Sequence, residues 1–255
     1  ESLMSNRTPR LTGLVRVIPD VEDLYDELGA VLVAAAQKAV RDRGVFHLAL
    51  SGGSTPEPFY MRLVTEPAFR PLPWADTHLW LVDERRVPQD DERSNYLMIR
   101  QALADHVPTP EDQKHPVPVE EEDPAAAYEH TLRQAMGKMD DQVPRLDFVL
   151  LGMGDDGHTA SLFPHSKALR ENDRLIALND GRCVTPPPRV TMTYTLLNAA
   201  RHLAVLVTGA KKAQAVRRIE AQLRNGPDPV ELPITGIDPI DGTLTWYLDA
   251  AAAGL

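Results

Sequence analysis

Residues 45–56 read VFHLALSGGSTP, and this stretch decides the fold class of the protein. Its first six residues form a short, largely apolar run, which is typical of a strand buried on both faces of a parallel sheet. Two glycines and three hydroxyl side chains follow, and Pro56 starts a predicted helix over residues 57–64. A strand that passes through a glycine-rich turn into a helix is typical of α/β proteins.

The same alternation continues on both sides of this stretch. Apolar residues recur at three- and four-residue spacing over 21–43, between Asp20 as the predicted N-cap and Gly44, and this pattern predicts a long helix. Further strands are predicted over 78–82, 146–151, 174–178, 202–207 and 244–248, and further helices over 94–106, 124–139 and 211–223. We therefore predict an α/β fold with a mainly parallel, doubly wound sheet and flanking helices.

The composition describes one globular unit. Hydrophobic residues make up 43% of the chain and charged residues 25%, which excludes disorder as the main state. No shift in composition divides the chain, so we expect a single domain over residues 1–255. Residues 1–10 and 250–255 lack a periodic apolar face, and we expect both ends to be disordered.

Charge limits the partners of the protein. Its 255 residues include 27 Lys and Arg against 37 Asp and Glu, which gives a formal net charge of −10 at pH 7. A surface this negative repels nucleic acid and anionic membranes, so we expect neither as a partner. An anionic ligand must then be bound by a local group of cations.

Cysteine content and hydropathy exclude further classes. Cys183 is the single cysteine, so the chain forms no internal disulfide, and no Cys/His spacing predicts a metal site. No apolar signal segment opens the sequence, and no apolar run reaches 18 residues. We expect a cytoplasmic protein without a membrane span.

Polar sequence follows four of the predicted strands, at the point where each strand ends. These polar stretches are residues 51–55, 83–85, 154–158 and 208–212. In open parallel sheets, ligands bind at the carboxyl ends of the strands, near the point where the strand order reverses. We therefore expect the functional site at this edge of the sheet.

The first of these loops suits an anion. Gly52 and Gly53 allow the backbone to approach a ligand closely, Ser54 and Thr55 add hydroxyl groups, and the helix that Pro56 starts presents free amides. A glycine pair after a strand is also often a plain tight turn, so the loop alone leaves both interpretations open.

Three cationic residues extend the anion hypothesis. Lys211 and Lys212 stand at the start of a predicted helix, where the helix dipole disfavours a cation unless an anion lies between them. A solvated surface pair explains the two lysines as well. Arg189 follows three prolines, which stiffen the chain and limit the entropy lost when the side chain is ordered.

The loop after the strand at 146–151 holds the best candidate for proton transfer. Residues 152–157 match GxGxxG, but a dinucleotide is rejected because two aspartates would face the pyrophosphate and Pro164 ends any following helix. His158 has an ordinary pKa suited to base chemistry near neutral pH, and Asp155 or Asp156 would orient its ring. A purely structural or solvated histidine is the alternative.

Several motifs in order carry a family resemblance. They are LALSGGSTP at 48–56, DER at 83–85 with SNY at 94–96, GMGDDGHTASLFP at 152–164, PPRVTMT at 187–193, and TG at 208–209 with Lys212. The chain resembles the 6-phosphogluconolactonases over about residues 15–250. The resemblance implies a Rossmann-type fold of the NagB/RpiA kind and hydrolysis of 6-phospho-D-glucono-1,5-lactone to 6-phospho-D-gluconate in the oxidative pentose phosphate pathway.

The resemblance also implies roles for residues. His158 would activate the attacking water, and the loop with Thr55, together with Arg85, Arg189 and Lys212, would hold the phosphate and the developing negative charge. Asp83 and Asp156 would tune His158 or hold sugar hydroxyls. No cofactor and no metal are implied, and the partner is a small phosphorylated sugar lactone.

Three alternatives remain open. Glucosamine-6-phosphate deaminases of the same superfamily carry a Glu five residues after the motif histidine and tend to have DEY, whereas this chain has Phe163 and Arg85 at the matching positions. A non-catalytic sugar-phosphate binding module would not need His158. A nicotinamide-dependent dehydrogenase depends on the rejected glycine pattern alone. For the assembly we expect a monomer or a weak homodimer.

Overall fold

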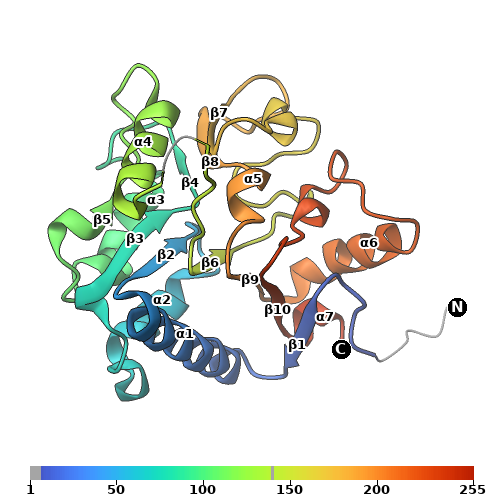
Figure 1. The fold of residues 1–255 in the computed structure, drawn as a ribbon. Helices are drawn as coiled ribbons and strands as arrows, with labels where there is room; N and C mark the ends of the chain where they lie inside the picture. Colours follow the sequence, from blue (N-terminus) through green and yellow to red (C-terminus); the bar gives the residue numbers. More distant parts are fainter. Residues whose placement is uncertain (1–6, 139–140) are drawn as a thin grey trace, which may run out of the picture.

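The computed structural model describes residues 7–138 and 141–255, and its centre is a parallel sheet (Figure 1). Within these residues the sheet has seven strands in the order β1-β10-β9-β6-β2-β3-β5, and every neighbouring pair is parallel. The strands are β1 (Leu14–Ile18), β2 (Phe46–Leu50), β3 (Thr77–Leu81), β5 (Lys114–His115), β6 (Phe148–Leu151), β9 (His202–Val207) and β10 (Thr243–Asp249). The predicted α/β fold with a mainly parallel sheet is confirmed.

A second, smaller sheet lies beyond one end of the main sheet. It is antiparallel, with the order β4-β8-β7, and consists of β4 (Asp83–Arg85), β7 (Ile176–Asn179) and β8 (Arg189–Met192). The backbone N–H of Val82 donates to the carbonyl of Leu50, and Met192 N–H donates to Val82, so the second sheet continues from the end of β3. Only β7 was predicted as a strand.

The helices flank the main sheet. They are α1 (Val21–Arg43), α2 (Glu57–Thr65), α3 (Asn95–Ile99), α4 (Pro124–Met136), α5 (Tyr194–Leu197), α6 (Ala213–Leu223) and α7 (Ala250–Ala253). None of the helices in the described residues is long and apolar enough to cross a membrane.

The local signals that end helices account for their bounds. The prediction for α1 is confirmed at both ends, because Asp20 accepts from the backbone of Glu22 and Asp23, and Gly44 takes a left-handed φ of 79°. The helix predicted over 124–139 ends earlier, at Gly137, which also has a positive φ. The helix predicted over 94–106 is divided, because α3 passes into a π-helical turn over Arg100–Ala104.

The structure differs from the expectation of disordered ends. Ala250–Ala253 form helix α7, which Asp249 caps by accepting from the N–H of Ala252, and Ala252 is buried. At the other end, Glu220 accepts from the side chain of Arg7 at 2.7 Å and from the backbone of Arg10 at 3.1 Å. Residues 1–6 lie outside the described residues.

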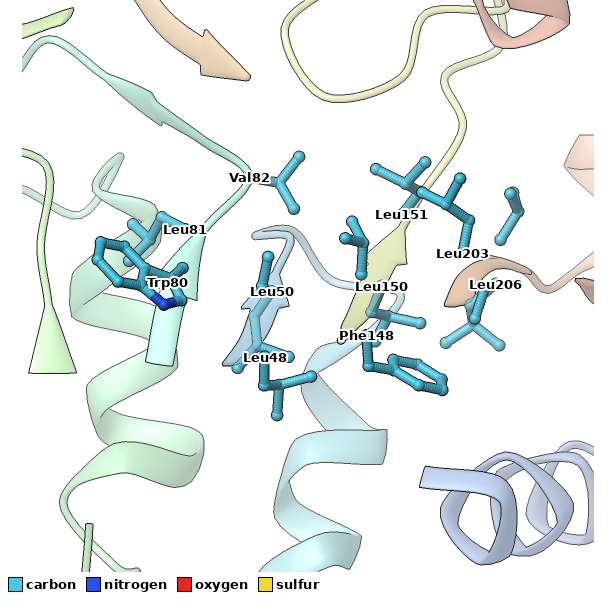
Figure 2. Close-up of a cluster of buried hydrophobic side chains, with 14 of the residues drawn as sticks. Leu48, Leu50, Trp80, Leu81, Val82, Phe148, Leu150, Leu151, Leu203 and Leu206 are labelled. Atoms are coloured by element: carbon cyan, nitrogen blue, oxygen red, sulfur yellow. The ribbon is translucent and has the colours of Figure 1, made fainter. Parts of the chain in front are cut away.

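The core explains why the central strands read as continuous apolar runs. Every residue of β2 and β6 is buried, and their side chains pack with those of β3 and β9 (Figure 2). Buried side chains of the small sheet, such as Val190 and Met192, belong to the same hydrophobic cluster as Leu48 and Leu150. The single-domain interpretation stays a prediction, and this shared core supports it.

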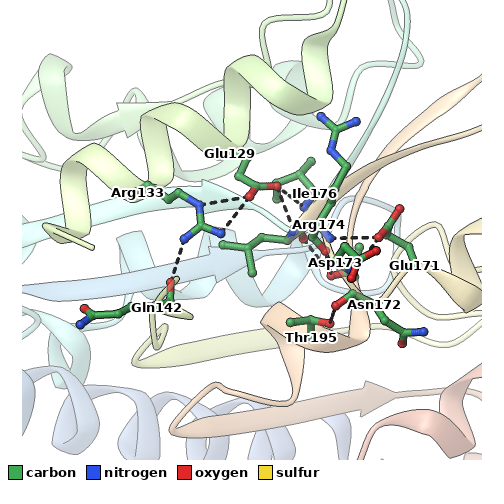
Figure 3. Close-up of polar contacts among 11 residues, drawn as sticks. Glu129, Arg133, Gln142, Glu171, Asn172, Asp173, Arg174, Ile176 and Thr195 are labelled. Atoms are coloured by element: carbon green, nitrogen blue, oxygen red, sulfur yellow. Dashed lines mark hydrogen bonds and ion pairs between the residues drawn. The ribbon is translucent and has the colours of Figure 1, made fainter. Parts of the chain in front are cut away.

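One carboxylate fastens the small sheet to α4 (Figure 3). Glu129 Oε2 accepts from the backbone N–H groups of Leu175, at 2.9 Å, and Ile176, at 3.2 Å, while Oε1 accepts from Arg133. Glu129 therefore fixes the start of β7 against α4.

The strand order places a crevice between β2 and β6. The chain leaves β2 for β3 and β5 on one side, and leaves β6 for β9 and β10 on the other, so the winding direction reverses between these two strands. The loops at their carboxyl ends diverge at this point, which is where α/β sheets bind ligands.

Candidate active site

A cleft of about 250 Å³ opens at this crevice. The predicted site residues that line it are Gly52, Gly53, Ser54, Thr55, Asp83, Arg85, His158, Arg189 and Lys212. Asp156 is the predicted residue that does not line the cleft, and it lies behind His158 with its side chain on the imidazole. The structure therefore brings the polar ends of β2, β3, β6 and β9 together, as the strand-end argument predicts.

The glycine-rich loop needs its glycines for two separate reasons. Gly53 has a φ of +99°, a conformation that side chains rarely adopt. A Cβ on Gly52 would lie 2.1 Å from Oδ1 of Asn95, so only glycine lets α3 pack against the loop. Tyr60 of α2 donates its hydroxyl proton to the carbonyl of Ser51 at 2.6 Å, which joins the loop to the helix it precedes.

His158 is oriented by a neighbouring carboxylate. Asp156 Oδ1 lies 2.6 Å from His158 Nδ1 and also accepts from the backbone N–H of His158 at 3.0 Å. A Cβ on Gly154 would lie 2.1 Å from the same Nδ1, so the ring occupies space that only a glycine leaves.

The charge of Asp156 decides which ring nitrogen is available. Burial raises the pKa of Asp156, but the hydrogen bond and charge of His158 outweigh burial and lower the pKa below its usual value. An ionised Asp156 accepts from Nδ1–H, and this hydrogen bond assigns the tautomer in which Nε2 carries the lone pair. The pair therefore has the arrangement of a general base with its orienting carboxylate.

Phe163 connects this base to a cation. Its buried ring lies with its centroid 4.7 Å from that of His158, and the Arg189 guanidinium carbon lies 5.3 Å from the Phe163 centroid. A cation at this distance over a ring face is attracted by the ring quadrupole. The same side chain thus supports both the imidazole and the guanidinium.

Two arginines of the small sheet form the cationic wall. Arg85 and Arg189 are direct register partners in the antiparallel β4–β8 pair, where like charges repel. Burial lowers the pKa of Arg189, which Asp83 raises and the Arg85 charge lowers further. Among the described residues, the buried Nε of Arg85 has no hydrogen-bond acceptor. An anion between the two guanidinium groups would offset this repulsion.

Lys212 also lines the cleft, next to the loop that carries His158. Its Nζ is 2.7 Å from Oδ1 of Asp155, whose side chain is largely exposed. The lysine stands immediately before α6, as expected, and Asp155 holds it beside the loop that carries His158.

Sequence similarity decides the family of the chain. A family model described as "Glucosamine-6-phosphate isomerases/6-phosphogluconolactonase" matches residues 19–246. The chain belongs to this family. A protein from Synechocystis sp. named 6-phosphogluconolactonase is 43% identical over 243 residues, which cover 93% of this chain and 96% of that protein.

Solved structures of the glucosamine-6-phosphate isomerase/6-phosphogluconolactonase family share the architecture. The 6-phosphogluconolactonase from Trypanosoma cruzi superposes with a TM-score of 0.79 at 30% identity, covering 97% of this chain and 98% of the other. A monomeric glucosamine-6-phosphate deaminase superposes with a TM-score of 0.72 at 19% identity, a likeness in fold alone.

In this member of the family, the cleft contains residues that we did not predict as site residues. Asn95 donates from Nδ2 to the carbonyl of Asp83 at 2.9 Å, and Thr159 donates to the carbonyl of Gly152 at 2.8 Å. Asn95 stands in the SNY motif, but its approach to a loop more than forty residues earlier in the chain carries no local signal. The lining also includes Met153 and Ala160.

A hydrogen-bond network holds Asp83 in place. Ser161 donates its hydroxyl proton to Asp83 Oδ2 at 2.6 Å. The adjacent Glu84 takes no part in this hydrogen bond. Its carboxylate accepts instead from the backbone N–H groups of Asn95 and Tyr96 and from the hydroxyl of Ser94. Glu84 is buried, and burial raises its pKa. Within the described residues, no group of three His, Cys, Asp or Glu side chains is placed to hold a metal ion.

Proposed function

We propose that the chain is a 6-phosphogluconolactonase, which hydrolyses 6-phospho-D-glucono-1,5-lactone to 6-phospho-D-gluconate. The observation that carries this proposal is the His158–Asp156 pair at a cleft that Arg85 and Arg189 also line. A base and a group of cations are what hydrolysis of a phosphorylated lactone needs. The relative from Synechocystis sp. carries the same name.

The reaction proceeds with one proton shuttle. His158 Nε2 accepts a proton from a water molecule as the water oxygen bonds to the lactone carbonyl carbon, and Asp156 stabilises the resulting imidazolium. The tetrahedral intermediate then collapses, the bond between the carbonyl carbon and the ring oxygen breaks, and Nε2–H returns the proton to the leaving ring oxygen. The carboxylic acid product loses its proton to solvent. Each step uses only groups that line or support the cleft.

The cations of the cleft bind different negatively charged groups of the substrate. Arg85 and Arg189, with the amides and hydroxyls of the loop at Ser54 and Thr55, hold the phosphate, because guanidinium groups match its oxygens in geometry and charge. Lys212 lies beside the His158 loop and stabilises the oxyanion that develops there. Asp83 accepts from the sugar hydroxyls.

Phe163 separates this function from the deaminase alternative. At the position where the resemblance expects a glutamate in the deaminases, the chain has a buried aromatic ring, which cannot transfer a proton. We therefore propose no ring-opening deamination. We further propose that the protein works in the cytoplasm, in the oxidative pentose phosphate pathway, as a monomer or a weak homodimer and without nucleic acid.

The decisive test measures proton release from freshly prepared lactone, with the spontaneous opening subtracted, for the unchanged protein and for His158→Ala. Loss of a general base lowers the rate by about 10²–10⁴-fold. A matched variant, the exposed His130→Ala, should keep the full rate. If the unchanged protein binds the lactone but does not accelerate its opening, the protein is a binding module; if His158→Ala keeps full activity, the mechanism is wrong.

A further inference from the structure

A second cavity, of about 290 Å³, lies at the opposite edge of the main sheet. It is found at the amino ends of β6 and β9, because Asp147 directly precedes β6 and His202 begins β9. Its charged and titratable lining consists of Lys38, Arg43, Arg145, Asp147, Arg201, His202 and Asp241. The catalytic cleft at the carboxyl ends of the same strands accounts for none of these side chains.

One buried carboxylate serves two arginines in this cavity. Asp147 Oδ1 lies 2.6 Å from Arg43 Nη2 and 3.4 Å from Arg201 Nε. Its other oxygen, Oδ2, accepts from the backbone N–H of His47 at 2.8 Å and is therefore already occupied. One carboxylate charge therefore faces two guanidinium groups, and of its two arginine contacts only the one to Arg43 has hydrogen-bond geometry.

Of the two arginines at Asp147, Arg201 has an unsatisfied hydrogen-bond donor. Its Nε is buried without a hydrogen-bond acceptor in the part of the chain that the structure describes, and an unsatisfied buried donor is costly. Burial lowers the pKa of Arg201, and the charges of Arg43 and Arg145 lower it further. About a third of the side chain, 34%, is exposed, although the Nε atom itself is buried.

Arg145 provides the contrast within the cavity. It donates to the carbonyl of Ala199 at 2.9 Å and to the backbone and carboxylate of Asp241, so its donors are used. His202 is held by Thr243, with Nδ1 2.8 Å from Oγ1. The unsatisfied donor thus lies on the side of the cavity where Arg43 and Arg201 share Asp147.

We propose that this cavity is a second anion site, which binds a phosphate group, either free or carried by a small organic molecule. Guanidinium forks match phosphate oxygens in geometry and charge, and a phosphate would add the negative charge that one carboxylate shared by Arg43 and Arg201 does not supply. The volume is at the lower end of the range for ligand pockets, which favours a small ion over a nucleotide. A local excess of cations in a chain with net charge −10 is what an anion site requires.

Calorimetric titration tests the proposal with the catalytic cleft disabled. Inorganic phosphate and, separately, glycerol phosphate are titrated into the double variant Arg85→Gln/Arg189→Gln, which should bind one equivalent. Adding Arg201→Gln should weaken binding at least tenfold, whereas Arg224→Gln, an exposed arginine on the surface, should not. Preference between the two probes shows whether the phosphate is free or esterified.

Two results would overturn the second site. One is absence of phosphate binding to the folded double variant, and the other is an equal effect of Arg201→Gln and Arg224→Gln. Thermal melts check that each variant is folded. If the double variant melts early, the titration is made on the otherwise unchanged protein, where Arg201→Gln should reduce the stoichiometry from about two to about one, and an unchanged stoichiometry refutes the site. Neither outcome depends on lactone hydrolysis.

Discussion

At the scale of single residues, the site depends on pairs whose members are close in space for different reasons. Asp156 and His158 are two residues apart, so a short turn brings them together; the sequence predicted Asp155 or Asp156 as the partner of His158, and the structure has Asp156 there and Asp155 on Lys212. Gly52 and Asn95 meet only because α3 packs against the first loop, and no local pattern shows this. Residue-level prediction therefore works where the contact is local in the chain.

Replacing the orienting carboxylate should slow the reaction without weakening substrate binding. In Asp156→Asn the neutral amide no longer fixes the tautomer of His158 or stabilises the imidazolium, so kcat for lactone hydrolysis should fall by up to about 10⁴-fold, the loss that the same change causes in a Ser-His-Asp triad. The KM should change little, because Asp156 does not line the cleft. Initial rates over a range of lactone concentrations separate the two constants, and an unchanged kcat would show that Asp156 only shapes the turn.

The Phe163 ring, which contacts both His158 and Arg189, leads to a second prediction at this scale. Phe163→Leu removes the ring that contacts both His158 and Arg189, so kcat should fall and KM should rise together. A buried Phe-to-Leu change also destabilises the fold, and Phe69→Leu is a matched control, because Phe69 is equally buried but packs against Gly29. Kinetics and melting temperatures of both variants decide. If Phe69→Leu shows the same kinetic loss, the Phe163 ring has no special role in catalysis.

At the scale of elements, length and amphipathic pattern determine how well each piece is predicted. The long helix α1 has caps at both ends and an apolar stripe, and its predicted bounds are confirmed. The strands β4, β5 and β8 are short, and β8 begins with Arg189, which we interpreted as an anion-binding residue after three prolines and did not place in a strand. Their pairing partners are distant in the chain, so only the assembled sheets make them strands.

Strands β2, β3 and β5 bring three histidines together in the core. His78 Nδ1 lies 2.9 Å from His115 Nε2, so one ring must donate and the other accept, and Trp80 donates to Nδ1 of His47 at 3.1 Å. Burial lowers the pKa of His47 to about 3 and that of His115 to about 4, each assisted by the charge of His78. Burial lowers the pKa of His78 as well, against the charge of Asp112.

This cluster predicts a loss of stability in mild acid. Folded pKa values below the ordinary 6.5 mean that the unfolded chain binds more protons, so the stabilisation is complete above about pH 6.5 and falls as the pH drops towards 4 and 3. Between pH 6.5 and 4 the loss should be about 3 kcal/mol for each of His47 and His115, at about 1.4 kcal/mol for each pH unit. Urea unfolding between pH 7 and 4 measures it. His115→Gln should flatten the pH dependence, and the exposed His130→Gln should not; equal slopes in all three proteins would contradict the prediction.

At the scale of the whole molecule, strand order is the property that the sequence did not show. Alternating elements predicted the parallel sheet and the edge at which ligands bind, yet the order β1-β10-β9-β6-β2-β3-β5 results from the choice of neighbours for each strand, which depends on tertiary packing. The reversal between β2 and β6 explains why the loops at 51–55 and 152–158 face one cleft. The small sheet then adds Arg85 and Arg189 from above the same crevice.

The shared core predicts that the protein unfolds as one unit. Leu150 lies on β6, the strand between the two halves of the sheet, and it is 1% exposed. Leu150→Ala should lower the free energy of unfolding by about 2–5 kcal/mol. If the chain is one domain, the variant shifts a single transition, because hydrophobic contacts join both halves and both sheets. Tryptophan fluorescence follows each half separately: Trp74→Phe/Trp80→Phe leaves Trp246 on β10 as the only reporter, and Trp246→Phe leaves Trp74 and Trp80, just before and on β3. Coincident midpoints in both backgrounds fit one domain, whereas separate midpoints, with only one moved by Leu150→Ala, would divide the chain into two.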